Sequence, residues 1–182
     1  MTFTETAIPG VLIVDSDVFS DERGTFVRAW MPEEFAARGL ETRIAQCSMA
    51  SNRRRGTIRG LHYQVAPSEE VKLIRAVRGS MFDVAADLRP DSPAYGRWTG
   101  VTLSADNRRM LYIPQGVAHG YQTLTDDTEV FYFVSTAYSP DHQRGLRWND
   151  PTLAIDWPLG APTALSERDA AFADFTADAG GT

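Results

Sequence analysis

Cysteine, positive charge and long apolar runs are all scarce in this chain of 182 residues. The single cysteine, Cys47, excludes an intramolecular disulfide and a cysteine-based zinc cluster; it fits a reducing compartment, and we expect it to be buried. With 24 Asp and Glu against 18 Lys and Arg, the net charge of -6 argues against nucleic acid or anionic membrane as a partner. No run approaches a membrane span, and the segment from Met1 to Gly10 lacks a signal-peptide pattern, so a cytoplasmic protein is predicted.

Helical patterns are scarce as well. Only Met31 to Arg38, with a proline suited to the first turn, and a weaker segment from Ser166 to Phe175 have the features of helices. Short runs rich in β-forming residues recur instead between Gly, Pro, Asp and Asn, which is typical of an all-β sandwich or barrel. Examples of these runs are Val11 to Val14, Gly24 to Ala29, Val71 to Val77, Met81 to Leu88, Thr99 to Leu103, Met110 to Ile113 and Glu129 to Val134.

The length and the 43% content of hydrophobic residues suit one sizeable core. A single domain over residues 1–182 is therefore predicted, with fraying expected from Asp178 to Thr182. One predicted strand has two different faces, because Asp83 and Asp87 alternate with apolar residues between Ser80 and Leu88. We expect the carboxylate face to line a wet or reactive space.

Two of the three histidines lie in segments dense in glycine and β-forming residues. Gly56 precedes His62 by six positions, and a Pro-x-Gly-x-x-His segment ends at His119; these spacings resemble the two motifs of cupins, which would bring both histidines to one barrel mouth. Metal-binding cupins normally continue the first motif as His-x-His with a following glutamate, but tyrosine and glutamine follow His62. Because catalytic metals usually hold three protein ligands, a metal-free site is predicted. Histidines that are merely hydrogen-bonded in the core are the alternative.

Short segments spread over nearly the whole chain share one further resemblance. They are Asp21-Glu-Arg-Gly-Thr-Phe26, Arg59-Gly-Leu-His-Tyr-Gln64, Val71-Lys-Leu-Ile-Arg75, Gly79-Ser-Met-Phe-Asp-Val84, Asp87-Leu-Arg89, Pro114-Gln-Gly-Val-Ala-His-Gly120, Trp148-Asn-Asp-Pro151 and Asp156-Trp-Pro158. In these segments the chain resembles the dTDP-4-dehydrorhamnose 3,5-epimerase family. The resemblance implies a cupin jelly-roll barrel with short peripheral helices, acting as a homodimer without metal or cofactor on a nucleotide-linked 4-keto-6-deoxyhexose.

Inversion of a carbon beside a keto group requires a base on one face, a proton donor on the other and a group that holds the enolate oxygen. The resemblance implies that His62 is the base, Tyr132 the acid and Lys72 the enolate stabiliser. Asp169 resembles the carboxylate paired with the base histidine, where it would fix the tautomer and stabilise the imidazolium. At a possible helix start it could instead be a first-turn acid near the positive end of the dipole.

A second catalytic pair is implied by the same resemblance, which places His119 beside Asp83 deep in the barrel. A partner for Asp83 is expected on physical grounds too, because an unpaired buried carboxylate is costly. Whether His119 moves protons or only orients the sugar stays open.

Binding of the anionic substrate must come from local cations, because the chain is acidic overall. Arg23 and Arg59 match family positions associated with the diphosphate, and the planar guanidinium suits phosphate oxygens. Phe26, Gln46 and Tyr138 match positions around the nucleotide or the sugar. By contrast, we expect the run from Arg53 to Arg55 to be a solvated hairpin tip.

Two positions depart from the family pattern. Arg28 stands where the family commonly has a glutamate linked to the nucleotide part of the site, so an acceptor has become a donor and the identity of the base is open. Ser48 stands where an asparagine is frequent. We include Arg28 among the substrate-binding candidates.

The leading hypothesis is epimerisation at C3, C5 or both, through an enolate, in deoxysugar biosynthesis. Alternatives are a related enzyme that inverts a single carbon or acts as a 3,4-ketoisomerase, and a noncatalytic sugar-binding cupin, since a fold alone does not establish activity. Retention of base, acid and enolate stabiliser weighs against a noncatalytic role.

Overall fold

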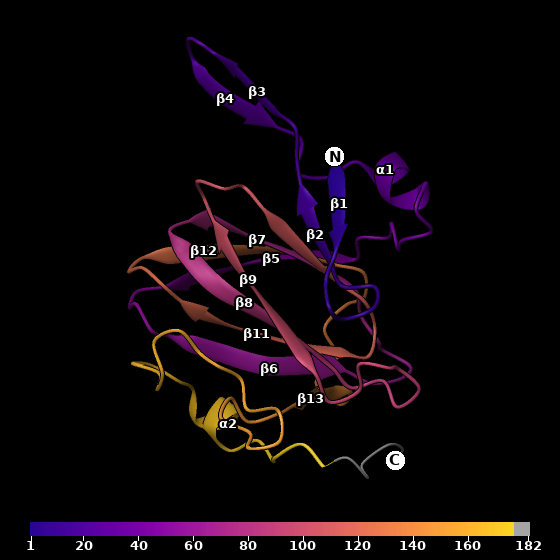
Figure 1. The fold of residues 1–182 in the computed structure, drawn as a ribbon, viewed down its shortest axis with the longest axis vertical. Coiled ribbons are helices and arrows are strands. Elements are labelled where there is room, and N and C mark those ends of the chain that lie inside the picture. Colours follow the sequence, from indigo (N-terminus) through magenta and orange to yellow (C-terminus); the bar gives the residue numbers. More distant parts are fainter. Residues whose placement is uncertain (177–182) are drawn as a thin grey trace.

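A computed structural model describes residues 1–176 as two antiparallel sheets packed face to face (Figure 1). The six-stranded sheet has the order β1 (Thr2–Glu5), β2 (Leu12–Asp15), β10 (Met110–Ile113), β7 (Lys72–Arg78), β12 (Thr128–Val134) and β5 (Gln46–Asn52). The five-stranded sheet has the order β13 (Gln143–Gly145), β6 (Ile58–Gln64), β11 (Val117–Thr123), β8 (Ser80–Asp87) and β9 (Trp98–Ser104). The predicted all-β jelly roll is confirmed.

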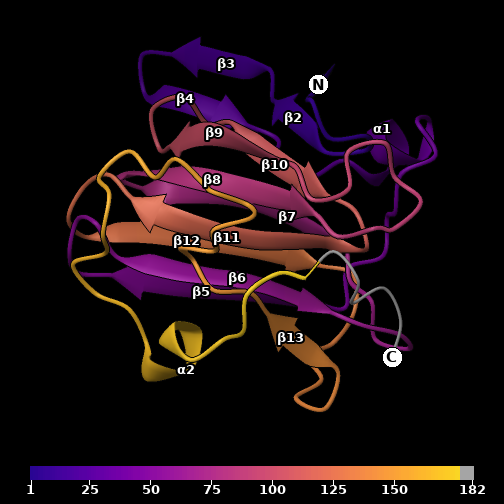
Figure 2. The same cartoon turned by 60° about the horizontal axis from the view of Figure 1, so that its bottom comes forward.

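A two-stranded hairpin, which we call the arm, stands apart from both sheets. It consists of β3 (Val18–Asp21) and β4 (Gly24–Val27), and Figure 1 shows it extending beyond the strands of the sheets. Figure 2 shows it on the side of the molecule opposite β13 and the second helix. Three apolar side chains of the arm are exposed to solvent, namely Val18, Phe19 and Phe26.

Both helices are shorter than predicted. The first, α1 (Pro32–Ala36), ends because the N–H groups of Gly39 and Leu40 bond back to the carbonyls of its last turn, with Gly39 at a φ of +69°. The second, α2 (Glu167–Ala170), begins at a Ser166 cap but ends far before Phe175. Its predicted extension is wrong because Phe175 is drawn into the core. Within residues 1–176, neither helix has the length and apolarity needed to cross a bilayer.

Three apolar clusters cover both faces of each sheet. The first lies between the sheets and includes Ile74, Met81, Leu111 and Val130. The second covers the outer face of the five-stranded sheet with residues of the C-terminal segment, among them Leu146, Leu153, Ile155, Trp157 and Phe175. The third covers part of the outer face of the six-stranded sheet with Phe35 of α1. The space between the sheets is therefore packed with apolar side chains except in one region, where polar side chains take their place.

The carboxylate face of β8 was expected to line a wet or reactive space, and this holds for Asp83 but not for Asp87. Asp83 and Asp87 are both fully buried, because their face of the strand is directed toward the core between the sheets. Asp87 is compensated by an ion pair with Arg89 at 2.6 Å and by the hydroxyl of Ser92 at 2.6 Å. The carboxylate of Asp87 therefore has a structural role, and only Asp83 lies near the reactive space.

The expectation that Cys47 is buried is wrong as well. The cysteine is exposed on β5, which is the edge strand of the six-stranded sheet. Periodicity could not reveal this, because the strand's position in the sheet depends on long-range pairing with β12.

Candidate active site

A polar cavity of about 290 Å³ lies between the two sheets. Both sheets contribute to it, since β5, β7 and β12 belong to one and β6 and β11 to the other. The side chains that carry possible chemistry are His62, Lys72, His119 and Tyr132, together with Arg59, Glu70, Tyr121, Gln46 and Tyr138. The structure thus places in one cavity four of the six residues that sequence comparison assigned to catalysis.

His62 and Asp169 form a hydrogen-bonded dyad at the wall of this cavity. The Nε2 atom of His62 lies 2.9 Å from Oδ1 of Asp169, whose other oxygen accepts the backbone N–H of Gly60 at 3.0 Å. Burial opposes ionisation of Asp169, but the bonds from His62 and Gly60 outweigh it and hold the pKa of the carboxyl below its usual value. An ionised Asp169 accepts a hydrogen bond from the N–H of Nε2, so Nδ1 is the nitrogen available as a base.

The place of this dyad depends on close contact between β6 and β11. Gly60 has a φ of +105°, and a Cβ atom there would lie 2.6 Å from the carbonyl oxygen of His119. Glycine permits both the backbone conformation and this approach. The two strands then pair so that His62 lies opposite His119.

His119 and Asp83 form a second, more deeply buried pair. Nε2 of His119 lies 2.7 Å from Oδ1 of Asp83, and the aspartate is fully buried. Burial raises the pKa of Asp83, although His119 and Lys72 act in the opposite direction. Among residues 1–176, Oδ2 of Asp83 has no hydrogen-bond partner.

Lys72 enters the cavity from β7. Its Nζ donates to the main-chain oxygen of His62 at 3.2 Å and lies 2.8 Å from Oε1 of Glu70. The ammonium is thus close to the histidine dyad without contacting its ring nitrogens. It can donate to an oxygen that becomes negative while His62 accepts a proton.

Tyr132 enters the cavity from β12 and contacts the buried histidine. Its ring is 6.2 Å from the ring of His119 in an edge-to-face arrangement. Burial, together with Tyr121 and Asp83, raises the pKa of Tyr132 well above its usual value. The phenol therefore keeps its proton near neutral pH, which is the state that a general acid requires.

A hydrogen-bonded network that sequence reasoning missed connects Arg59 to the tyrosines. Oδ1 of Asn52 accepts from Nε of Arg59 at 2.8 Å and from the hydroxyl of Tyr121 at 3.2 Å. Tyr121 in turn is hydrogen-bonded to Tyr132. Tyr121 lies two residues after His119 in the same strand and therefore on the same face. This position could have identified Tyr121 as a site residue from the sequence. Nothing in the local sequence marks Asn52.

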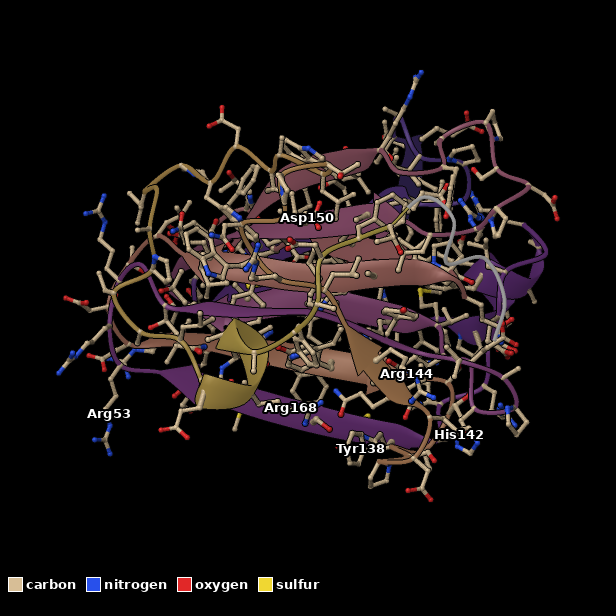
Figure 3. All side chains as sticks on the ribbon, turned by 90° about the horizontal axis from the view of Figure 1, so that it is seen from below. Arg53, Tyr138, His142, Arg144, Asp150 and Arg168 are labelled. Carbon is tan, nitrogen blue, oxygen red and sulfur yellow. The ribbon has the colours of Figure 1, made fainter. Side chains whose placement is uncertain are left out.

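A second hollow, of about 480 Å³, adjoins the cavity and shares Arg59 and His62 with it. Arg168 of α2 also lines this hollow, and Figure 3 labels its side chain beside that helix. Sequence reasoning missed Arg168 although it precedes Asp169. Two guanidinium groups at one hollow suit a phosphorylated ligand.

Gln46 and Tyr138 lie together at the cavity mouth. Oε1 of Gln46 accepts the backbone N–H of Tyr138 at 3.0 Å, and its Nε2 donates to Ser48 at 3.1 Å. The Tyr138 side chain is half exposed. Farther away, the residues from Arg53 to Arg55 are exposed, and Figure 3 shows Arg53 pointing outward at one end of the molecule.

The arm and the residue that directly follows it, Arg28, include three substrate-binding candidates that do not line the cavity of the same chain. Arg23 lies at the tip of the hairpin and pairs with Asp21. The guanidinium of Arg28 lies 5.2 Å from the ring centroid of Phe19 and 5.5 Å from that of Phe26. A single chain therefore does not bring Arg23, Phe26 and Arg28 together with His62.

The donor set of the described residues contains no group of three or more His, Cys, Asp or Glu side chains that could hold a metal ion. The metal-free reaction stays a prediction. The paired carboxylates instead orient the two histidines.

Comparisons with known proteins agree on one family. Residues 5–177 match the family model described as dTDP-4-dehydrorhamnose 3,5-epimerase. A dTDP-4-dehydrorhamnose 3,5-epimerase of Methanothermobacter thermautotrophicus is 44% identical over 169 residues, covering 92% of this chain and 90% of the relative.

Solved structures give the same result. The dTDP-4-dehydrorhamnose 3,5-epimerase of Bacillus anthracis, with TDP and PPi bound, superposes with a TM-score of 0.92 at 38% identity, covering 96% of this chain and 99% of that one. A 3'-monoepimerase from Streptomyces bikiniensis in complex with dTDP-quinovose superposes with a TM-score of 0.86 at 32% identity, covering 93% of this chain and 85% of that one.

Proposed function

Because this chain belongs to the dTDP-4-dehydrorhamnose 3,5-epimerase family, we propose that it epimerises a nucleotide-linked 4-keto-6-deoxyhexose, with dTDP as the nucleotide. The enzyme is an isomerase of that family. The observation that carries the proposal is the common cavity, in which a carboxylate-bound imidazole, an ammonium and a protonated phenol lie together. These are the base, the enolate stabiliser and the acid that the reaction needs.

In the first step, Nδ1 of His62 removes the proton from the carbon next to the keto group. The C–H electron pair forms a C=C bond, and the carbonyl electrons move to oxygen to give an enolate. Asp169 stabilises the imidazolium that results, because its carboxylate is held 2.9 Å from Nε2. Lys72 donates to the enolate oxygen.

In the second step, the enolate collapses back to the ketone while its carbon takes a proton from the opposite face. Tyr132 supplies this proton, and its phenolate recovers one from solvent. The imidazolium of His62 releases to solvent the proton that it took in the first step, which returns the site to its starting state. Tyr121 supports the step because it is hydrogen-bonded to Tyr132. His119 and Asp83 orient the sugar at the bottom of the cavity, or take part in proton transfer.

The diphosphate is held by Arg59, with Arg168 as a further cation across the adjoining hollow. Arg23, Phe26 and Arg28 would complete the nucleotide site from the arm of a second copy, so the working form is a homodimer with shared sites. The support for this is the exposed apolar surface of an arm that extends away from its own barrel. Gln46 and Tyr138 line the entrance for sugar or base.

Two further points belong to the proposal. Inversion of one carbon instead of two is the second candidate, because a 3'-monoepimerase shares the fold at 32% identity. A cytoplasmic setting, with no nucleic acid or membrane partner, is supported by the acidic composition and the single cysteine.

Incubation with dTDP-4-keto-6-deoxyglucose in deuterated water tests the function. We expect deuterium at C3, C5 or both, the same rate after exhaustive treatment with EDTA, and a loss of roughly 10²- to 10⁴-fold in His62→Ala. Arg54→Ala, an exposed arginine outside the cavity, serves as the control and should keep the wild-type rate. Absence of label with the wild-type protein would refute the proposal, and loss of rate with EDTA that one added divalent ion restores would refute its metal-free chemistry.

A further inference from the structure

The cavity contains one carboxylate that the reaction scheme has not used. Oε1 of Glu70 lies 2.8 Å from Nζ of Lys72, and both side chains are largely buried, with 12% and 11% of their surfaces exposed. Glu70 lines the same cavity as His62 and Tyr132. An ion pair this sheltered from solvent is screened much less than one on the surface.

We propose that Glu70 is a positioning residue of the reaction, which aims the ammonium of Lys72 at the keto oxygen of the substrate. A lysine ammonium has three N–H donors on a flexible four-carbon stem. The Glu70 carboxylate forms an ion pair with this ammonium, and the main-chain oxygen of His62 accepts one of its N–H groups at 3.2 Å. The flexible side chain is thus restrained by two neighbouring groups, which hold the ammonium in the cavity beside the base.

Glu70 can do this because its own backbone is held on both sides. The carbonyl of Glu69 accepts the hydroxyl of Thr136 at 2.7 Å, and the N–H of Val71 donates to the hydroxyl of Ser135 at 2.8 Å. Both bonds tie the segment before β7 to the chain that follows β12. The carboxylate is therefore presented by a rigid backbone at the edge of the cavity.

The segment is also bound to β6 through Gln64. Its Nε2 donates to the carbonyl of Ser68 at 2.9 Å, and its Oε1 accepts the N–H of Ser139 at 2.6 Å. The hydroxyls of Ser68 and Ser139 both contact Nδ1 of His142, at 3.2 and 2.7 Å. Strand β6 therefore sets the place of His62 and, through Gln64, restrains the segment that carries Glu70.

A carboxylate beside the ammonium also has an opposing effect, since it offsets part of the positive charge offered to the enolate. Positioning and charge can be separated by substitution. Glu70→Gln keeps an oxygen acceptor of the same size but removes the charge, whereas Glu70→Ala removes both. If orientation is what matters, glutamine restores most of the rate that alanine loses.

For Glu70→Ala we expect kcat to fall roughly 10- to 100-fold, the usual effect of misplacing a reacting group. KM should stay within about threefold, because the interaction acts on the transition state. The rates of deuterium exchange and of inversion should fall together. Lys72 stabilises the enolate as it forms, before the enolate is protonated on either face. Glu69→Ala is the matched control, because its side chain is the exposed neighbour on the same segment and lies outside the cavity.

The decisive measurement is a double-mutant cycle with Lys72→Ala. The rate of each variant is measured as incorporation of deuterium from solvent into the sugar. If Glu70 acts through the ammonium, Glu70→Ala costs no further rate in the Lys72→Ala background. An equal loss in both backgrounds, or a wild-type rate for Glu70→Ala in the wild-type background, would overturn the inference. Should Glu70→Ala fail to fold, Glu70→Gln decides: a loss as deep as that of Lys72→Ala rules out orientation as the role.

This inference rests on the proposed function only for the role of Lys72. The two fail differently. A wild-type protein that incorporates no deuterium from solvent refutes the proposed function, whereas a wild-type protein that exchanges normally beside an unaffected Glu70→Ala variant refutes the positioning role alone.

Discussion

At the scale of single residues, the proposed base and the proposed acid of the site differ in their surroundings. The side chain of His62 is 28% exposed and bound to an ionised carboxylate, which suits a group that gains a proton. Tyr132 lies in a buried setting that raises its pKa and keeps it neutral. Two groups with different environments can therefore serve opposite proton transfers at one pH.

This division predicts that Tyr132→Phe fails differently from His62→Ala. The variant keeps the base, so the enolate still forms and is protonated again by His62 on its original face. We expect deuterium to enter with retained configuration while inversion falls by roughly 10²-fold or more. Nuclear magnetic resonance of the recovered sugar measures both rates. Inversion at a near wild-type rate would assign the acid to another group, with Tyr121 and Tyr138 the next to test.

At the scale of elements, the contact between β6 and β11 sets the spacing of the two histidine pairs. The strands approach closely at Gly60, where an added Cβ would lie 2.6 Å from the oxygen of His119 and 2.7 Å from the Cα of Gly120. Both of these are backbone atoms, which cannot move as the end of a flexible side chain can. The same residue donates its N–H to Asp169.

Gly60→Ala should therefore lower the free energy of unfolding by roughly 2 to 5 kcal/mol, from a strained positive φ together with overpacking. Urea denaturation measures the change. Gly39→Ala is the control, because Gly39 also has a positive φ but no atom within 4 Å of the added Cβ. Equal losses in the two variants would show that backbone strain alone accounts for the effect and that the strand contact adds nothing.

At the scale of the whole molecule, the position of the arm bears on whether each active site is formed by one chain or by two. Arg23 lies on the arm and His62 in the barrel, so a shared site takes them from different subunits. Closed twofold assembly would make such an exchange reciprocal. One dimer would then contain two sites, each with the barrel of one chain and the arm of the other.

Subunit mixing tests this arrangement. Arg23→Ala and His62→Ala should each be impaired as pure proteins, the first mainly in substrate binding. After unfolding and refolding together in equal amounts, half of the dimers should be mixed and each should hold one intact site, giving about a quarter of wild-type activity for reciprocal twofold assembly. Activity no higher than the average of the two pure variants, or a fully active monomer in sedimentation, would contradict shared sites.

The sequence by itself determined the fold class and the positions of seven strands, and it supplied the residues proposed for the site. Alternation along the chain is a local property, so the runs near Met81 and Met110 were found close to their true bounds. The motifs around His62 and His119 could be found from the sequence because their glycines and histidines lie within a few positions of one another. Helix ends were less accurate, because the packing of Phe175 competes with local helix preference.

Only the tertiary structure decided which side chains meet and how deeply each is buried. Asn52 contacts Tyr121 across 69 positions of sequence, and Asp169 reaches His62 across 107. The burial of Asp87 and the exposure of Cys47 both went against expectation. The physical reason is the same in each case: sheet order and register arise from long-range strand pairing, and they determine whether a given face of a strand borders core, cavity or solvent.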